Sequence, residues 1–304
     1  MTCFIHWMAF TIPSETPIEN IFNKILELPF SDFQLQQNGQ DGYKIRYVND
    51  TNTILVLTDG GHEQMGHHVR LTGQACEALQ KHLLPIAKRV MNICGTFSRI
   101  DLAVDDFAGM LDMNEMEEAI RQGQCTSRFK NPPRVENGFD QQTGKLVGKA
   151  IKFGSRTSRM YLRIYDKAAE QKVDFLWVRL EIEAKRKNAT AIMKALAEGE
   201  TTGGMLFGLL DSYLSFKELC TDSNRSRRPV AAWWKQFLGE TKKITLLSPT
   251  KKTKPNDFRW FINNYDKTLV RVMEECGPEI ILDMYASGLK KLDRSKLADQ
   301  QEKR

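Results

Sequence analysis

Residues 153–167 read FGSRTSRMYLRIYDK and carry the pattern from which the fold is predicted most directly. Polar and apolar side chains alternate from residue 160 to residue 165. Because successive side chains of an extended chain point to opposite faces, we expect a strand with one core face and one polar face. A tyrosine hydroxyl becomes a nucleophile when a base, a metal or nearby cations activate it. The polar face would carry Tyr161, Arg163 and Tyr165, and the apolar face Met160, Leu162 and Ile164.

Two other segments, 97–107 and 176–184, divide their side chains in the same way. If the three segments are neighbours in one antiparallel sheet, their polar faces coincide. Carboxylate oxygens suit Mg²⁺ or Mn²⁺, and arginine holds a phosphate through paired hydrogen bonds, so the combined face would resemble a nuclease site. An ordinary half-exposed sheet with Arg–carboxylate pairs across its strands is the alternative. The two added polar faces carry Arg99, Asp101 and Asp105, and Arg179, Glu181 and Glu183.

The remaining periodicities predict an α+β fold, with antiparallel sheets, helices packed on one face and a helical C-terminal part. Segment 123–150 shows no periodicity and is expected to be a long exposed excursion, and no internal repeat is evident. We expect a catalytic domain over 1–220 and a basic, mainly helical region over 221–304. Further strands are predicted at 6–12, 43–48, 53–58, 67–71 and 149–153, and helices at 16–28, 74–94 with a kink at Pro85, 114–122, 188–198, 205–219, 230–238, 257–276 and 278–289.

Composition limits the classes of function. The chain is 41% hydrophobic and 27% charged, and no run approaches the roughly 18 to 20 apolar residues that cross a bilayer. Without a secretory signature, a cytoplasmic protein with six reduced cysteines is expected.

Residues 221–254 hold nine basic and two acidic side chains, which indicates a polyanionic partner unless the segment is only a solvated tail. Trp233 and Trp234 are expected to pack in a core rather than to stack on bases.

The histidines do not form a zinc motif. His62, His67 and His68 lie close in sequence, but adjacent residues of a strand point to opposite faces, so His67 and His68 could not both bind one ion without a bulge. No His-hydrophobe-His strand is present either.

Seven short motifs occur in order between residues 4 and 275. Together they resemble the replication initiation factor family, whose members include rolling-circle initiators of staphylococcal-type plasmids and of certain filamentous phages. The motifs are FxxWxxFT from Phe4, LTGQxC from Leu71, RIDLAVDDF from Arg99, FGSR from Phe153, LRIYDK from Leu162, WVRLEIE from Trp177 and WWxxFLG from Trp233.

The resemblance implies a protein that nicks one strand of a double-strand origin, stays linked to the 5′ phosphate through a tyrosine and later rejoins the strand. It implies Tyr165 as nucleophile, with Tyr161 in reserve, and a site for Mg²⁺ or Mn²⁺. Arg163, Lys167 and Arg156 would bind phosphate or lower the pKa of the tyrosine. The expected metal ligands are Asp101 and Glu181, then Glu183 and Asp105, and the expected DNA-binding residues are Arg156, Arg159, Arg128, Lys130, Arg225, Arg227 and Arg228.

Origin DNA is the expected partner, both as duplex and as nicked single strand. Binding to a host helicase and formation of a homodimer are left open. No membrane partner is expected. A rival function is an origin-binding protein that recruits a host nuclease or helicase. The combination of Tyr165, Lys167, Asp101 and Glu181 favours the enzyme, since a binding module has no need of all four. A small-molecule enzyme is disfavoured because glycine-rich phosphate loops and G-x-S-x-G are missing from the sequence.

Overall fold

The computed structural model describes residues 1–240, 244, 246, 270–277, 279, 280, 282, 283 and 286. The chain divides into two compact units, Met1–Leu246 and Leu247–Arg304. The boundary between them falls at residue 246 and not at the predicted 220, because apolar residues after 220, such as Trp234 and Phe237, are buried in the core of the first unit. Most of the predicted helices 257–276 and 278–289, and Lys251, Lys252 and Lys254, lie outside the described residues.

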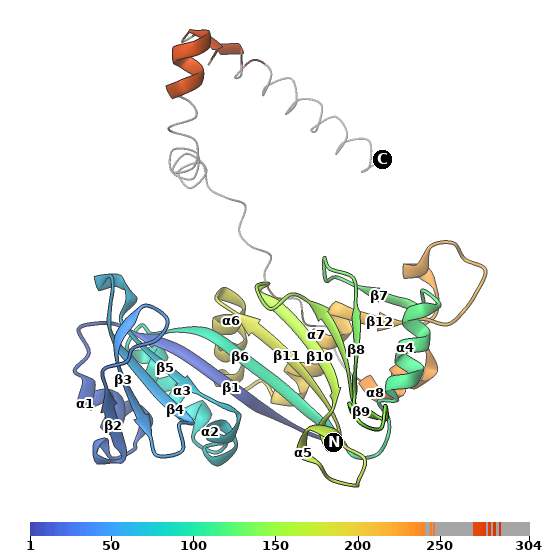
Figure 1. Ribbon diagram of the computed structural model, residues 1–304, viewed down its shortest axis with the longest axis horizontal. Coiled ribbons are helices and arrows are strands. Elements are labelled where there is room, and N and C mark those ends of the chain that lie inside the picture. The colour runs from blue at the N-terminus through green and yellow to red at the C-terminus, as the bar shows by residue number, and fades with distance from the viewer. Residues whose placement is uncertain are drawn as a thin grey trace. The chain divides into compact units, whose positions relative to one another are not determined.

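In the described part of the chain, one antiparallel sheet of ten strands has the order β2-β3-β4-β5-β1-β6-β11-β10-β9-β8 (Figure 1). The predicted α+β class is confirmed. A second sheet pairs β7 (Cys125–Ser127) with β12 (Leu214–Phe216). The strands of the large sheet are β1 (Thr2–Ile12), β2 (Phe33–Gln36), β3 (Tyr43–Asn49), β4 (Ile54–Gly60), β5 (His67–Leu71), β6 (Thr96–Asp106), β8 (Arg134–Phe139), β9 (Leu146–Gly154), β10 (Met160–Asp166) and β11 (Val178–Lys185).

The large sheet consists of two halves with the same topology. The central strands β1 and β6 pair with each other, and outward from them follow β5, β4, β3 and β2 on one side and β11, β10, β9 and β8 on the other. In both halves a helical segment follows the central strand and further helices follow the last strand. The internal repeat that the sequence does not reveal is therefore present in the topology.

Helices α3, α6 and α7 pack against the central strands from one side and share a single hydrophobic core with them (Figure 1). Ile100, Leu102 and Val104 of β6 point into this core. The polar side chains of β6, β10 and β11 therefore lie on the other face. The helices are α1 (Ile18–Asn20), the π-helical η1 (Ile21–Leu26), α2 (Gly73–Ala78), α3 (Leu83–Asn92), α4 (Met113–Arg121), α5 (Lys167–Gln171), α6 (Lys187–Ala197), α7 (Thr202–Tyr213) and α8 (Ala232–Leu238).

Three predicted elements differ in detail. The predicted helix 74–94 is two helices, and Pro85 lies in the first turn of α3, where its missing N–H is tolerated. The predicted helix 205–219 ends at Tyr213 and continues as β12. The predicted excursion 123–150 contains β7, β8 and the start of β9, because β8 pairs with β9 at the edge of the sheet. None of the helices within the described residues is both long and apolar enough to cross a membrane.

Candidate active site

The three polar faces meet because β11 lies between β6 and β10. Glu181 of β11 is opposite Ala103 of β6 and Arg163 of β10. Glu183 is likewise opposite Asp101 and Tyr161. Residues directly opposite each other in a sheet project from the same face. The predicted adjacency of the three strands is therefore confirmed.

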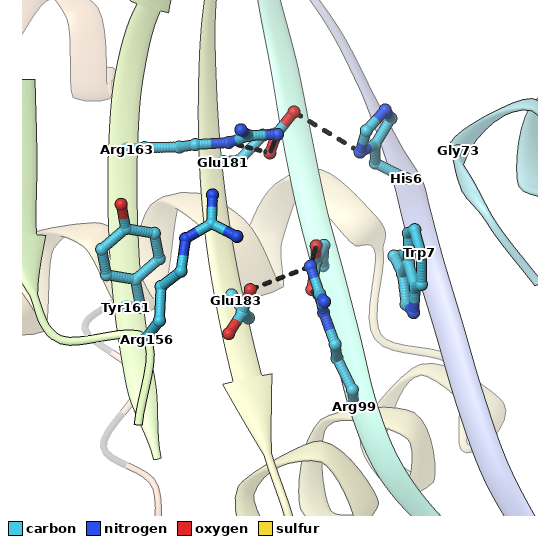
Figure 2. Close-up of a pocket in the computed structure, with 10 residues that line it drawn as sticks. His6, Trp7, Gly73, Arg99, Arg156, Tyr161, Arg163, Glu181 and Glu183 are labelled. Atoms are coloured by element: carbon cyan, nitrogen blue, oxygen red, sulfur yellow. Dashed lines mark hydrogen bonds and ion pairs between the residues drawn. The ribbon is translucent and has the colours of Figure 1, made fainter. Parts of the chain in front are cut away.

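A fourth strand contributes a residue that the sequence analysis missed. The register between β1 and β6 shifts between Ile5 and Trp7, so His6 is the extra residue of a β-bulge. Both His6 and Trp7 border the site as a result (Figure 2). Strict alternation would have sent the two side chains to opposite faces. Trp7 lies under the guanidinium of Arg99, with Cζ of Arg99 4.6 Å from its ring centre.

His6, Asp101 and Glu181 form a group that could hold a metal ion, with one ligand atom of each within 4.8 Å of the others. Nδ1 of His6 lies 3.4 Å from Oε1 of Glu181 and is buried without a hydrogen-bond partner. Burial lowers the pKa of His6. Its imidazole is therefore neutral near pH 7, which is the form that binds metals.

The carboxylates complete a set of donors that fits a divalent cation. Complete burial raises the pKa of Asp101 to about 6, against the lowering effect of Arg99. Burial also disfavours the charged form of Glu181, but the charge of Arg163 favours it and the pKa of Glu181 is lowered. One imidazole and two carboxylates can together bind a divalent metal ion.

All four predicted carboxylate ligands pair with cations of the chain. Asp101 accepts two hydrogen bonds from Arg99, and Glu181 pairs with Arg163. Glu183 pairs with Arg99 at 2.8 Å (Figure 2). It also pairs with Lys185 at 2.6 Å. Asp105 accepts two hydrogen bonds from Arg179, at 2.6 and 2.8 Å. Glu183 and Asp105 lie on the predicted face, but neither belongs to the His6 cluster.

The two candidate tyrosines have different surroundings. Tyr165 donates a hydrogen bond of 2.8 Å to Oε1 of Glu181, and Cζ of Arg163 lies 4.6 Å from its ring centre. Burial, followed by the charge of Glu181, raises the pKa of Tyr165. Tyr161 borders a cavity of about 280 Å³ that is also bordered by His6, with Cζ of Arg156 5.9 Å from its ring centre. Tyr165 is thus linked to the cluster by a hydrogen bond, and Tyr161 by a shared cavity.

The predicted phosphate-binding cations lie around this cluster. Arg163 pairs with Glu181 at 2.6 Å, and Arg156 borders the same cavity as Tyr161 (Figure 2). Nζ of Lys167 lies 5.8 Å from the ring centre of Tyr165. Each of the three cations thus lies near the ring of one of the two tyrosines.

The residues predicted to bind DNA farther away are spread over three segments. Arg159 is exposed just before β10, and Arg128 and Lys130 are exposed in the segment between β7 and β8. In the basic segment after residue 220, two of the three predicted arginines contact Asp222: Arg227 pairs with its carboxylate at 3.1 Å and Arg228 donates to its carbonyl at 2.8 Å. Arg225 is exposed.

Comparison with known proteins agrees with the two halves of the sheet. Residues 2–90 match the family described as Rolling Circle replication initiation protein N-terminal domain, and residues 95–282 match Replication initiation factor. The candidate DNA relaxase NicK of Bacillus subtilis (strain 168) is 25% identical over 305 residues, covering 94% of this chain and 84% of NicK.

A solved structure, that of the rolling circle replication initiator protein from Geobacillus stearothermophilus, is also similar. It has a TM-score of 0.73 and 28% sequence identity, and the match covers 78% of this chain and 95% of that one. The fold, the site and both sequence matches agree: the chain belongs to the replication initiation factor family.

Proposed function

We propose that this protein starts rolling-circle replication by nicking one strand of its double-strand origin through a tyrosine and later rejoining the strand. The observation that carries the proposal is the hydrogen bond from Tyr165 to Glu181, which joins a tyrosine hydroxyl to the cluster of His6, Asp101 and Glu181. The names of the two relatives, a relaxase and an initiator, support the same activity.

The cutting step is a transesterification. The phenolic oxygen of Tyr165 attacks the scissile phosphorus, a tyrosine–phosphorus bond forms, and the bond from phosphorus to the 3′ oxygen breaks. Because its raised pKa keeps Tyr165 protonated at rest, the step requires a base. Glu181 is in position to accept the proton, and the departing 3′ oxygen takes one from water. The free 3′ hydroxyl then primes synthesis, and the reverse step rejoins the strand.

His6, Asp101 and Glu181 would hold the metal, for which we propose Mg²⁺ or Mn²⁺. A divalent cation there supplies positive charge that stabilises the developing charge on the phosphate. Arg163 and Arg156 contribute fixed positive charge from β10 and the turn before it, and they bind and orient the phosphate. Lys167 lies close to the Tyr165 ring and favours the phenolate as it forms.

We further propose that the basic segment 221–254 and the exposed Arg128, Lys130 and Arg159 bind the duplex. Neutralised phosphates release counterions, so origin affinity should fall steeply as salt is raised. A salt-independent affinity would contradict a role for these cations. A host helicase, a homodimer and a cytoplasmic location remain predictions.

The deciding experiment uses supercoiled plasmids that carry cloned segments of the replicon encoding this chain. With Mg²⁺ or Mn²⁺, the protein should relax the plasmid that carries the origin and leave the others supercoiled. A mass spectrum after incubation with an origin oligonucleotide should show a protein–DNA adduct on a tyrosine. Specific binding without nicking or adduct, in either metal, would instead establish the rival function of a binding protein that recruits a nuclease.

A further inference from the structure

An exposed cluster of aromatic side chains lies beside the candidate active site. Phe107 follows the last residue of β6, and Phe175 and Trp177 precede β11; together we call them the aromatic platform. The ring centres of Phe175 and Trp177 are 6.0 Å apart with planes 14° apart, and Phe107 lies 5.5 Å from Trp177. Phe107 is 56% exposed and Phe175 is 53% exposed, so broad ring surface faces the solvent.

Cations lie against the platform. Nζ of Lys167 is 5.8 Å from the ring centre of Trp177, and Cζ of Arg179 is 5.4 Å from the same centre. Arg179 donates two hydrogen bonds to Asp105, which fix the guanidinium there. Each cation also pairs with a carboxylate, Lys167 with Glu170 and Arg179 with Asp105. The platform therefore combines apolar ring faces with cationic side chains, as surfaces that bind single-stranded nucleic acid do.

A cavity of about 710 Å³ connects the platform to the candidate active site. Phe107, Trp177 and Lys167 border it on one side. His6 and Gly73 border both this cavity and the one next to Tyr161. A DNA strand that runs from the proposed metal cluster along the sheet therefore enters this cavity and reaches the aromatic rings.

Lys167 lies close to both the proposed nucleophile and the aromatic platform. Its Nζ lies 5.8 Å from the ring centre of Tyr165 and 5.8 Å from that of Trp177. It therefore lies between the proposed nucleophile and the platform. A phosphate bound by Lys167 would place the base attached to it within reach of Trp177 and Phe107.

An exposed apolar patch on a protein surface is often a protein interface. Here the cations against the rings and the continuity with the cutting site favour a polyanion with flat apolar groups. Building on the proposed nicking function, we propose that the aromatic platform and its cavity bind unpaired nucleobases of the DNA strand next to the scissile phosphate. Because a base must leave its partner to stack on a ring, the platform holds the duplex open beside the nick.

The test compares two single-stranded probes that differ only in their bases: a fluorescent thymidine oligonucleotide and an abasic oligonucleotide of the same length. Stacking of bases on aromatic rings tolerates any sequence, so the probe needs no origin. The full-length protein should bind the thymidine probe at least about fivefold more tightly than the abasic one, as expected from one stacked base. Fluorescence anisotropy without metal gives both affinities.

The variant Phe107→Ala/Phe175→Ala should lose this preference while retaining its affinity for the abasic probe. Phe139→Ala is the matched control, because Phe139 is 59% exposed on the edge strand β8 and outside the platform. It should keep the full preference. Circular dichroism of both variants excludes unfolding as the cause of a loss.

Equal binding of the two probes by the unaltered protein would overturn the proposal, and so would a preference that survives in the double variant. The second result would assign the platform to a protein partner instead. The test requires neither metal nor cleavage, so its outcome is independent of whether the protein nicks DNA. A protein that nicks its origin but ignores the bases of the probe would refute the platform alone.

Discussion

The hydroxyl of Tyr165 donates a 2.8 Å hydrogen bond to Oε1 of Glu181, and the same oxygen lies 3.4 Å from Nδ1 of His6. Glu181 thus connects a tyrosine from β10 with a histidine from β1. The two strands are separated by β11 and β6, so the contact depends on the register of the whole central sheet. This relationship gives Tyr165 a direct link to the proposed metal cluster.

Replacing Tyr165 by Phe removes the hydroxyl and leaves the ring in place. We expect Tyr165→Phe to abolish the protein–DNA adduct and the relaxation of origin plasmid, with origin affinity changed less than about twofold, because phosphate contacts dominate affinity. Mass spectrometry and a gel-shift assay measure the two quantities.

Tyr161→Phe is the matched control, since Tyr161 lies on the same strand and the same face. It should still form the adduct. An adduct in the Tyr165→Phe protein but not in the Tyr161→Phe protein would assign the reaction to Tyr161. Normal cleavage by both variants would rule out a covalent intermediate on either tyrosine.

His6 is expected to be a metal ligand. His6→Asn should lower the apparent affinity for Mn²⁺, measured by calorimetry, by at least about tenfold, since even the residues that support metal ligands contribute this much. His67→Asn, at the start of β5, is the control and should bind Mn²⁺ normally, because the His67 ring instead contacts Thr58 and the carbonyl of Ser14. An unchanged Mn²⁺ affinity in His6→Asn would show that carboxylates alone bind the ion.

The central part of the site could be predicted because β10 and β11 pair without any irregularity. Alternation along each strand was then enough to place these polar side chains on one face. The pairing of Arg163 with Glu181 and of Tyr161 with Glu183 depends on the register, which alternation does not give. The resemblance, and not the periodicity, favoured Tyr165 over Tyr161. The structure adds the contact between Tyr165 and Glu181, which no one-dimensional pattern contains.

The contribution of β1 could not be predicted because a bulge changes the face on which a side chain lies. His6 and Trp7 read as an ordinary alternating pair, yet both border the site. The ranking of the carboxylates also depends on contacts between strands. Arg179 binds Asp105 across 74 positions of sequence, and only the folded sheet brings them together.

Gly73 begins α2 directly beside His6. A Cβ atom there would lie 2.6 Å from Nε2 of His6, closer than side-chain contacts permit. Gly73→Ala should therefore push the imidazole away from Asp101 and Glu181 and weaken Mn²⁺ binding at least about tenfold, the loss expected when ligand geometry is disturbed.

Gly203→Ala provides the matched control for this substitution. A Cβ at Gly203, in α7, would meet Sγ of Cys3 at an ordinary 3.6 Å. This variant should bind Mn²⁺ normally and unfold with a free energy up to about 1 kcal/mol higher, because alanine favours a helix over glycine. Equal Mn²⁺ affinities in Gly73→Ala and in the unaltered protein would show that His6 can move without losing the ion.

Asp105 is expected to stabilise the fold without binding the metal. Asp105→Asn leaves the guanidinium of Arg179 buried without its counter-charge, which should lower the free energy of unfolding by about 3 kcal/mol. Chemical denaturation measures this loss, and calorimetry should find Mn²⁺ affinity within about twofold of normal. Asp101→Asn is the comparison and should lose Mn²⁺ binding. A similar loss of Mn²⁺ binding in both variants would show that Asp105 is a metal ligand after all.

His68 makes the first half of the sheet sensitive to acid. Burial, with the charge of Arg70, lowers the pKa of His68 to about 4, while the unfolded chain protonates near 6.5. Between these values only the unfolded state gains a proton, so stability is complete above pH 6.5 and falls as the pH drops towards 4. The loss between pH 7.5 and pH 5 should be about 2 kcal/mol in urea denaturation. His68→Phe keeps a ring against Tyr43 but cannot titrate. Between pH 7.5 and pH 5 the variant should therefore lose about 2 kcal/mol less stability than the unaltered protein does. Equal losses in the two proteins would place the acid sensitivity on other groups.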